Sequence, residues 1–535
     1  MSFKPYWTIG FSGHRHVAQE PAGEAEARSK VQDLIQSELD KLVRLAAGHA
    51  RLAAVSSLAC GGDTLFAESV TKLDMPWLCL LPFAEDAFFV ADDFTDDELC
   101  AARTVRPLAY AEEIVCHPTS CAQTREKGWR DDAFHACGIA TVDEADIMMV
   151  VWRDGQAARG KGGTAEIVKY ARQRLKPLIV IDPDTSRVQY FNSGAKESSA
   201  VLGIAFEDAV CAALGALSLP ETFRMSPDAS PSRQEFDEFE ARVAHHANTK
   251  VPAVRRVSSK AVIFHSIATC LGVAALAFHS VHNSSLMHFV ISLVKFGLVG
   301  FGFYLLAWLL MKKPHKAAAT YRMAAELCRS LRATWSCTRY LHEVYEVPMP
   351  PEFNRLARSL GILQRRDRGA DPPELKSFRV EYTCRRLRDQ LKYYRGKVRK
   401  AKPWAQRSEG AAFLFSLVAL VATVIVLGCA IWHFWHLFHA ETGKGMSEWW
   451  VEMLSFFMVA MPALASMCVS LIAINEWKRR EARYHEMVEL LQSLAARFRH
   501  AANASAAESV AVDAERALLA ENFEWYHLAK QGAGV

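Results

Sequence analysis

The sequence lacks the patterns that mark metalloproteins, secreted proteins and nucleic-acid binders. Its 13 cysteines are scattered, with no CxxC pair and no cysteine–histidine group at zinc spacing. We therefore expect reduced thiols and no metal site. The net charge of +4 is small for 535 residues, and no basic groove with interleaved aromatic residues stands out, so we expect no nucleic-acid partner. The first residues, MSFKPYWTIGFSGHRH, do not resemble a signal peptide, so we expect the N-terminal part to stay in the cytoplasm.

Charged residues are nearly absent from four long apolar stretches in the second half of the chain. The stretches are 261–280, 288–311, 411–432 and 453–474, and Lys295 is the one Asp, Glu, Lys or Arg among them. Each can cross about 30 Å of hydrocarbon at about 1.5 Å per residue. We predict four transmembrane helices. The alternative is a set of buried core helices in a large soluble protein.

The basic residues beside these stretches indicate the orientation in the membrane. Lys and Arg gather before the first and third stretches and after the second and fourth, whereas the turn between the first two, VHNSSLM, has none. Because positive charge stays on the cytoplasmic side, both hairpins point outward. We expect a multi-pass protein of the bacterial inner, cytoplasmic membrane with both termini in the cytoplasm. A further basic run, 376–401, is interpreted as an anchor that faces anionic lipid.

Lys295 admits two interpretations. It could line a pore or contact another subunit, because charges inside a membrane are costly and usually functional. It could also extend its amine to the nearby outer interface, since it lies about two turns from the end of its stretch. Four helices in one chain are too few to enclose a wide path, so a pore implies a homo-oligomer.

An internal repeat follows the membrane hairpins. YRMAAELCRSLRATW begins at Tyr321 and YHEMVELLQSLAARF at Tyr484, and the two segments align without gaps. The identical pairs are Tyr321/Tyr484, Glu326/Glu489, Leu327/Leu490, Ser330/Ser493, Leu331/Leu494 and Ala333/Ala496. We predict a hairpin followed by a cytoplasmic amphipathic helix, present twice, with chance similarity as the alternative. The predicted domains are 1–220, which binds a nucleotide; 221–345, the first hairpin with its helix; 346–402, a basic linker and helix; and 403–535, the second hairpin with its helix.

The first 220 residues alternate between short apolar runs and amphipathic segments. Strands are predicted at 6–12, 51–57, 77–82, 146–152 and 177–182, and helices at 24–47, 63–73 and 163–175. Fully apolar strands that alternate with helices indicate a parallel sheet covered on both faces. We therefore expect an α/β Rossmann-like domain followed by an all-α membrane domain. In such sheets, ligands bind at the carboxyl ends of the strands.

Three glycine-containing loops follow predicted strands. The candidate ligand-binding residues are Gly10, Ser12, Gly13, His14 and Arg15 in the first loop, Gly61, Gly62 and Asp63 in the second, and Gly160, Lys161, Gly162, Gly163, Thr164 and Glu166 in the third. Glycine allows close backbone approach, and free N–H groups at a helix start attract phosphate. The alternative for each loop is ordinary turn chemistry. Asp63 could bind a ribose or cap the helix that follows it.

The ordered motifs GFSGHR, SSLACGGDTLFAE and ADIMMVVWRDG…RGKGGTAEIVKYAR resemble the SLOG superfamily over about residues 4–185. The resemblance implies a Rossmann-like domain that binds a nucleotide-derived molecule. That group includes Lonely Guy-type phosphoribohydrolases, whose Gly-Gly-x-Gly-Thr-x-x-Glu loop supplies a catalytic Glu. The hairpin-plus-helix unit resembles SLATT membrane modules, which accompany SLOG domains in bacterial conflict and antiphage systems.

The third loop departs from the hydrolase pattern. Glu166 follows Thr164 by two positions rather than three, which turns the carboxylate by roughly 100° on a helix. We therefore expect no catalytic residue and no resident cofactor, but a sensor of an ADP-ribose-like or cyclic-nucleotide messenger that opens or disrupts the membrane during infection. The alternative is a membrane-tethered phosphoribohydrolase or N-glycosidase with Glu166 as acid/base.

Overall fold

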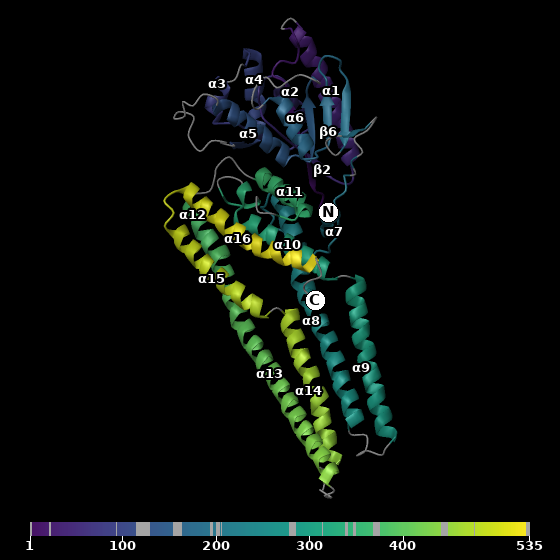
Figure 1. The fold of residues 1–535 in the computed structure, drawn as a ribbon. Helices are drawn as coiled ribbons and strands as arrows, with labels where there is room; N and C mark the ends of the chain where they lie inside the picture. The colour runs from purple at the N-terminus through teal and green to yellow at the C-terminus, as the bar shows by residue number, and fades with distance from the viewer. Residues whose placement is uncertain are drawn as a thin grey trace. The chain divides into compact units, whose positions relative to one another are not determined.

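The protein is described from a computed structural model as two compact units (Figure 1). It describes residues 3–530 except 21–22, 92–93, 114–128, 154–162, 193–195, 199–203, 205, 278–284, 313, 338–340, 346–348, 368–374, 440–447 and 476. The N-terminal unit comprises Met1–Arg242, Cys337–Tyr345 and Met349–Pro372. The helical unit comprises Val243–Ser336, Glu346–Pro348 and Pro373–Val535.

The N-terminal unit is built on a mixed, mostly parallel sheet. Its strands are β1 (Tyr6–Gly13), β2 (Arg51–Ser56), β3 (Trp77–Leu81), β4 (Tyr110–Glu113), β5 (Ile147–Val151), β6 (Leu178–Ile181), β7 (Val188–Asn192) and β8 (Lys196–Ser198). Their order is β4-β3-β2-β1-β5-β6-β7-β8, and β7 and β8 pair antiparallel at one edge. The five predicted strands are confirmed as β1, β2, β3, β5 and β6. The short strands β4, β7 and β8 at the edges of the sheet were not predicted from the sequence.

Helices cover both faces of this sheet. They are α1 (Glu24–Ala46), α2 (Gly62–Lys72), α3 (Glu85–Ala91), α4 (Asp96–Val105), the short 3-10 turn η2 (Arg106–Leu108), α5 (Trp129–Glu144), α6 (Thr164–Gln173) and α7 (Ala209–Gly215). Successive strand residues point to opposite faces. Ile9, Ala54 and Met149 therefore pack with α1 and α2, whereas Met148 and Val150 pack with α5 and α6. The result is three layers with an apolar core on each side of the sheet.

A distant helix, α11 (Pro351–Asp367), completes the N-terminal unit at the amino end of β1. Its Ser359 hydroxyl accepts the Tyr6 backbone N–H at 2.8 Å. Its Arg355 and Arg358 pair with the buried carboxylate of Asp146, which precedes β5. The sequence predicted that these residues belong to the linker 346–402, whereas α11 contacts β1 and belongs to the N-terminal unit, as does the 3-10 turn η3 (His342–Tyr345).

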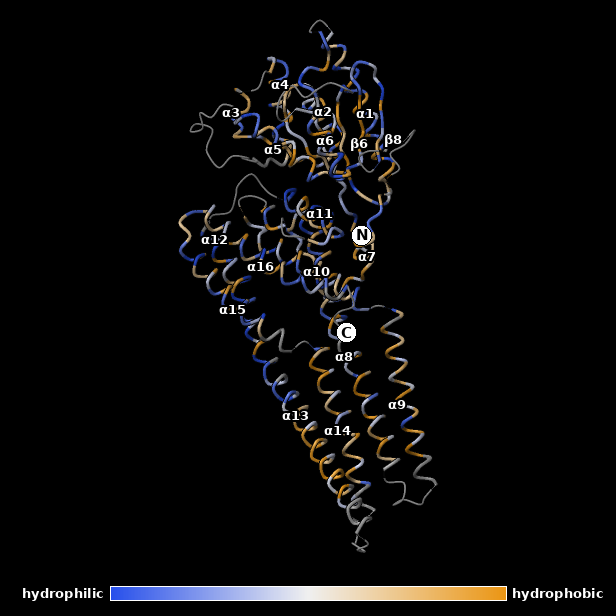
Figure 2. The backbone as a smooth tube through the Cα atoms, viewed as in Figure 1, coloured by the Kyte–Doolittle hydropathy of each residue, from blue (hydrophilic) through white to orange (hydrophobic). Residues whose placement is uncertain are grey.

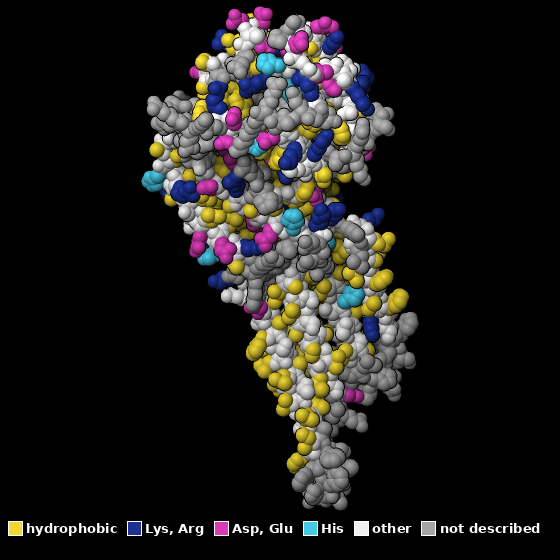
Figure 3. All heavy atoms as spheres, turned by 45° about the horizontal axis from the view of Figure 1, so that its top comes forward, with side chains coloured by type: hydrophobic (Ala, Val, Ile, Leu, Met, Phe, Trp, Pro, Cys, Tyr) yellow, Lys and Arg dark blue, Asp and Glu magenta, His cyan; other side chains and the backbone are white. Residues whose placement is uncertain are grey.

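The helical unit contains the apolar segments. Its elements are most of α8 (Pro231–Ala277), α9 (Ser285–Lys312), α10 (Pro314–Ala333), α12 (Leu375–Glu381), the π-helical turn η4 (Tyr382–Leu387), α13 (Arg388–His439), α14 (Glu448–Asn475), α15 (Trp477–Arg499) and α16 (Ala504–Lys530). Within the described residues, α8, α9, α13 and α14 are long and apolar enough to cross a membrane, as predicted (Figure 2). Residues 278–280 of the first predicted span lie outside the described residues. Hydrophobic side chains are exposed along these helices (Figure 3), as expected for contact with lipid.

The predicted repeat of two hairpins, each followed by a helix, is present in the element order α8-α9-α10 and α13-α14-α15. The repeated positions do not share one environment. Glu326 of α10 is buried and pairs with Arg386 and Arg329. Its counterpart Glu489 of α15 is exposed and lies 3.5 Å from His485. The difference arises because α10 packs against α16, whereas α15 packs mainly along α13.

Candidate functional site

The candidate site lies at the carboxyl ends of β1, β2 and β5. The strand order runs outward in opposite directions on either side of β1, because β2 and β3 follow on one side and β5 and β6 on the other. Loops that leave adjacent strands in opposite directions separate at such a switch point and leave a crevice for a ligand. The first two predicted glycine loops and the start of α6 all lie at this edge.

Glycines hold the first two loops against each other. A Cβ on Gly13 would lie 2.9 Å from the Gly62 Cα atom. Gly61 has φ +82°, and a Cβ there would lie 2.1 Å from the Arg15 carbonyl oxygen. Only glycine fits such contacts without displacing the neighbouring backbone. Glycine is therefore required here by the approach of the two loops, whatever else binds at this edge.

Gly10 has a different role from the one that we predicted. It lies inside β1, paired with Val55 and Met148, and not in the loop that follows. A Cβ on Gly10 would lie 2.3 Å from the Met148 sulfur and 2.6 Å from the Ala145 Cβ. The residue thus makes room for the α5 side of the core. Ser12 is also a strand residue, one position before the end of β1.

Several loop amides are hydrogen-bonded within the protein. The Gly13 N–H donates to the Asp63 carboxylate at 3.0 Å, and the Gly61 N–H donates to the Glu98 carboxylate at 3.2 Å. The Gly62 N–H donates to the His14 carbonyl oxygen at 3.0 Å. Asp63 is thus bonded to the first loop, a role that neither of its predicted alternatives included. A phosphate at this edge would have to displace these carboxylates or bind to other donors.

The third loop joins the other two through the start of α6. Gly163 is the residue before the helix, and the Thr164 hydroxyl donates to the Gly13 carbonyl oxygen at 3.0 Å. Glu166 lies in the first turn, where its carboxylate is 3.3 Å from His135 Nδ1 of α5. Gly160, Lys161 and Gly162 lie outside the described residues. In the described part of the third loop, the Thr164 hydroxyl therefore contacts the first loop, whereas the Glu166 carboxylate faces α5.

Two arginines supply positive charge at this edge. The Arg15 guanidinium lies 4.9 Å from the centre of the Phe134 ring. Arg153, which the sequence interpretation missed, donates to Asp184 at 2.9 Å and to the carbonyl oxygen of His16 at 3.4 Å. The hydrogen bond from Arg153 lowers the pKa of Asp184 below its ordinary value. The position of Arg153 directly after an apolar strand was the signal that could have identified it.

The backbone of Arg153 also binds the first loop. Its N–H donates to His14 Nε2 at 3.2 Å, so the segment after β5 is tied to the segment after β1. His14 also donates its own backbone N–H to the Val151 carbonyl oxygen at 3.2 Å. The candidate site is thus a cluster of three strand ends, held by main-chain and carboxylate contacts and bordered by cationic side chains.

No family model matches the chain, and no curated protein matches it.

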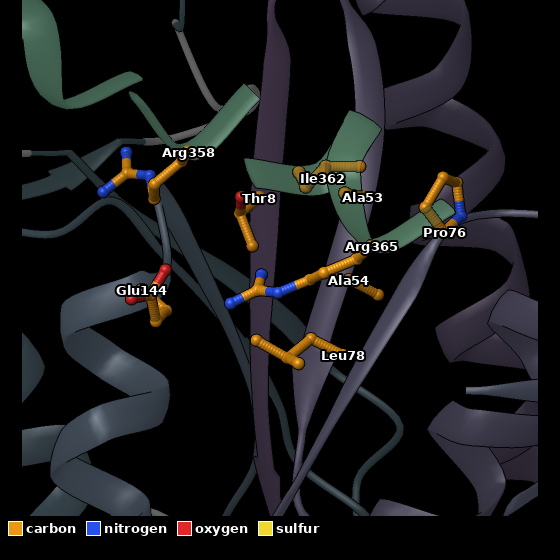
Figure 4. Close-up of a pocket in the computed structure, with 9 residues that line it drawn as sticks. All are labelled: Thr8, Ala53, Ala54, Pro76, Leu78, Glu144, Arg358, Ile362 and Arg365. Atoms are coloured by element: carbon orange, nitrogen blue, oxygen red, sulfur yellow. The ribbon is translucent and has the colours of Figure 1, made fainter. Parts of the chain in front are cut away.

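At the opposite edge of the sheet, the described residues form only a small cavity. It is lined by Thr8, Ala53, Ala54, Pro76, Leu78, Glu144, Arg358, Ile362 and Arg365. Its volume of about 20 Å³ has room for little more than one water molecule. Figure 4 shows Arg365 extending from α11 across the strands beside it. Where these residues lie, packing against α11 leaves no room for a nucleotide-sized ligand.

Lys295, the charged residue of the four apolar stretches, lies against the neighbouring helix of its hairpin. A Cβ on Gly272 of α8 would lie 2.6 Å from the Lys295 Nζ atom. In the same way, a Cβ on Gly302 of α9 would lie 2.6 Å from the His265 ring. Each helix thus presents one polar side chain to a glycine of the other. Small residues allow such close helix contacts in membranes.

Proposed function

We propose that this protein is a membrane effector controlled by a nucleotide-derived small molecule. The ligand binds at the carboxyl edge of the N-terminal sheet, and the four apolar helices respond by opening or disrupting the membrane as part of a homo-oligomer. The observation that carries the proposal is the convergence of Gly13, Gly62 and Thr164 from three strand ends at the switch point of the sheet. Arg15 at the same edge supplies a charge suited to phosphate.

The order of the three motifs, which resembles the SLOG arrangement, supports a nucleotide-derived ligand of the ADP-ribose or cyclic-nucleotide type. The resemblance of the hairpins to SLATT modules supports a role in bacterial defence at the cytoplasmic membrane. A ligand shifts the membrane part only if it binds the active arrangement more tightly than the resting one. Ligand and membrane response must therefore be measured in the same preparation.

The test uses the full-length protein reconstituted in dye-loaded liposomes, with ADP-ribose and AMP as probes. We expect one probe to bind and to raise dye release. Arg15→Gln removes the guanidinium from the candidate site and should weaken binding about tenfold, since a charge-assisted hydrogen bond is lost. Arg44→Gln is the matched control, because Arg44 is exposed in the last turn of α1.

Two results would contradict the proposal. Dye release at the same rate with and without each probe argues against a ligand-controlled effector. Equal affinity in Arg15→Gln and Arg44→Gln argues against this edge as the binding site.

The second candidate is a nucleotide hydrolase, and the pair of His135 with Glu166 is the observation that favours it. A carboxylate beside an imidazole could hold or transfer a proton during N-glycosidic cleavage. The full-length protein would then release adenine and ribose 5-phosphate from AMP, and Glu166→Gln would abolish that release. Binding of AMP without any product favours the sensor.

A further inference from the structure

A second cationic site lies in the helical unit, on the part of α13 that precedes its apolar segment. A groove of about 710 Å³ runs between this part of α13 and the end of α15. We name it the basic groove and define it by its lining residues, which are Thr383, Leu387, Arg388, Leu391, Lys392, Arg395, Gly396, Arg399, Ala495 and Arg499. Five of these ten residues are cationic, and none is acidic.

The cations face one way because of their spacing. Arg388, Lys392, Arg395 and Arg399 follow one another at intervals of four, three and four residues. At about 100° per residue they fall within about 60° of one another on the helix. Arg499 adds a fifth charge from the facing helix α15. The π-helical turn η4, from which Thr383 and Leu387 line the groove, immediately precedes α13, and π-helical turns are frequent at functional sites.

These five cations are exposed and have no carboxylate within ion-pair distance in the described part of the chain. Two arginines close to them in the sequence do pair with carboxylates. Arg385 pairs with Glu381 at 3.0 Å, and Arg497 pairs with Asp513 at 3.0 Å. Like charges four residues apart repel each other and destabilise a helix. The groove therefore concentrates positive charge at a cost in stability that the described ion pairs do not offset.

The distance from the apolar segment distinguishes a soluble anion from a lipid headgroup. The segment begins at residue 411, and Arg399 precedes it by 12 residues, or about 18 Å along the helix. The headgroup layer is only about 5–7 Å thick on each side of the hydrocarbon. The lipid anchor predicted from the sequence, 376–401, included four of the groove cations, but Lys400, Lys402 and Arg407 lie nearer to the segment and are better placed to contact anionic lipid. The groove itself lies beyond the reach of ordinary headgroups.

We propose that the basic groove binds a soluble small molecule that carries several phosphate groups. Its volume is within the usual range of ligand sites, about 300–1,000 Å³. Arginine forks match phosphate oxygens in pairs, and four arginines with one lysine suit a chain of linked phosphates. The site is independent of the N-terminal candidate site, since it is built wholly from η4, α13 and α15 of the helical unit.

The test uses the full-length protein in nanodiscs made of phosphatidylcholine, with inorganic triphosphate as the probe and calorimetry as the measurement. We expect one triphosphate per chain. Lys392→Gln with Arg395→Gln should weaken its binding about tenfold, because two of five charges are lost. Lys397→Gln with Lys400→Gln is the matched control, since it removes the same charge from exposed positions of α13 that do not line the groove. The control should change the affinity by less than about twofold.

Three outcomes would overturn the proposal. If both double variants weaken triphosphate binding equally, the effect comes from the overall charge of the helix and not from the groove. Binding that persists unchanged in the groove variant would locate triphosphate elsewhere. The third experiment uses nanodiscs that contain anionic lipid. If that lipid binds the groove and prevents triphosphate from binding, the groove binds a lipid headgroup and the proposal of a soluble ligand fails.

Discussion

Replacing Arg386 by methionine should destabilise the helical unit strongly. Arg386 of η4 lies between two buried carboxylates. Its Nε and Nη2 atoms donate to Glu515 at 2.8 and 2.5 Å, and Nη2 also donates to Glu326 at 2.9 Å. The side chains of Arg386, Glu326 and Glu515 are 5%, 7% and 0% exposed. The substitution leaves both carboxylates buried without this partner.

The expected size follows from that burial. Breaking one buried ion pair costs about 3–5 kcal/mol, and here two carboxylates lose the same arginine. For a unit of this size, a loss of about 4 kcal/mol lowers the Tm by about 10 °C. Thermal unfolding of the full-length protein in detergent, followed by tryptophan fluorescence, measures the change. Arg385→Met is the control, because Arg385 is 81% exposed and its pair with Glu381 contributes less than about 1 kcal/mol.

The loss should also depend on pH. Burial raises the pKa of Glu326, but the nearby Arg386 and Arg329 outweigh it and lower the pKa below the ordinary value. A carboxyl with a lowered pKa stabilises the fold above its unfolded pKa, and this contribution is lost as pH falls through the folded pKa. Without Arg386, Arg329 is the cation that remains on Glu326 and burial weighs more, so the pKa of Glu326 is higher than in the wild type and the Tm difference narrows when it is measured from pH 8 down to pH 5. A Tm difference that stays constant over this range, or a control that unfolds equally early, refutes this reasoning.

Three further predictions concern the N-terminal unit. Gly61→Ala places a Cβ against the Arg15 carbonyl oxygen at a positive φ, so it should lower stability by about 2 kcal/mol in thermal unfolding; an unchanged Tm contradicts the geometry. Asp146→Asn removes the charge that holds α11 and should cost about 2–4 kcal/mol, with hydrogen exchange rising first in α11 rather than throughout the unit. Burial lowers the pKa of Lys176, whose amine donates to the Ala145 carbonyl oxygen, to about 8. The cost of this buried charge is present below pH 8 and is relieved as pH rises towards 10.5, and competitive acetylation should give a midpoint near 8; a midpoint near 10.5 would show that the amine is not buried.

Local pattern predicted the elements whose burial is continuous along the chain. Apolar runs identified β1, β5 and the four long helices, because each such run needs a buried sheet or a lipid environment. It did not identify α11 as part of the N-terminal unit, since the contacts of Arg355 and Arg358 with Asp146 join residues more than 200 positions apart. Separations of that length leave no periodic signal.

The candidate site shows the same division. The glycine loops were apparent from the sequence, because three of them follow predicted strands; that Gly13 and Gly61 serve a close approach of two loops, and not only turn chemistry, is shown by the structure. The hydrogen bond from the Gly61 amide to the Glu98 carboxylate was not apparent from the sequence, because Glu98 belongs to an acidic segment without a regular pattern. Some backbone N–H groups of the glycine loops thus donate to side chains that only the tertiary structure brings near them.

The continuity of α13 has a mechanical consequence. Its 52 residues form one helix about 78 Å long, which carries the basic groove near one end and the third apolar segment near the other. Pro403 lies between the two regions and removes one backbone hydrogen bond there, so bending is easiest at this point. From Pro403 to the end of α13 at His439 the helix is about 54 Å long, and a bend of about 5° at Pro403 displaces that end by about 5 Å. A small rearrangement around a few phosphates is in this way amplified into a movement of the far end of the third apolar segment.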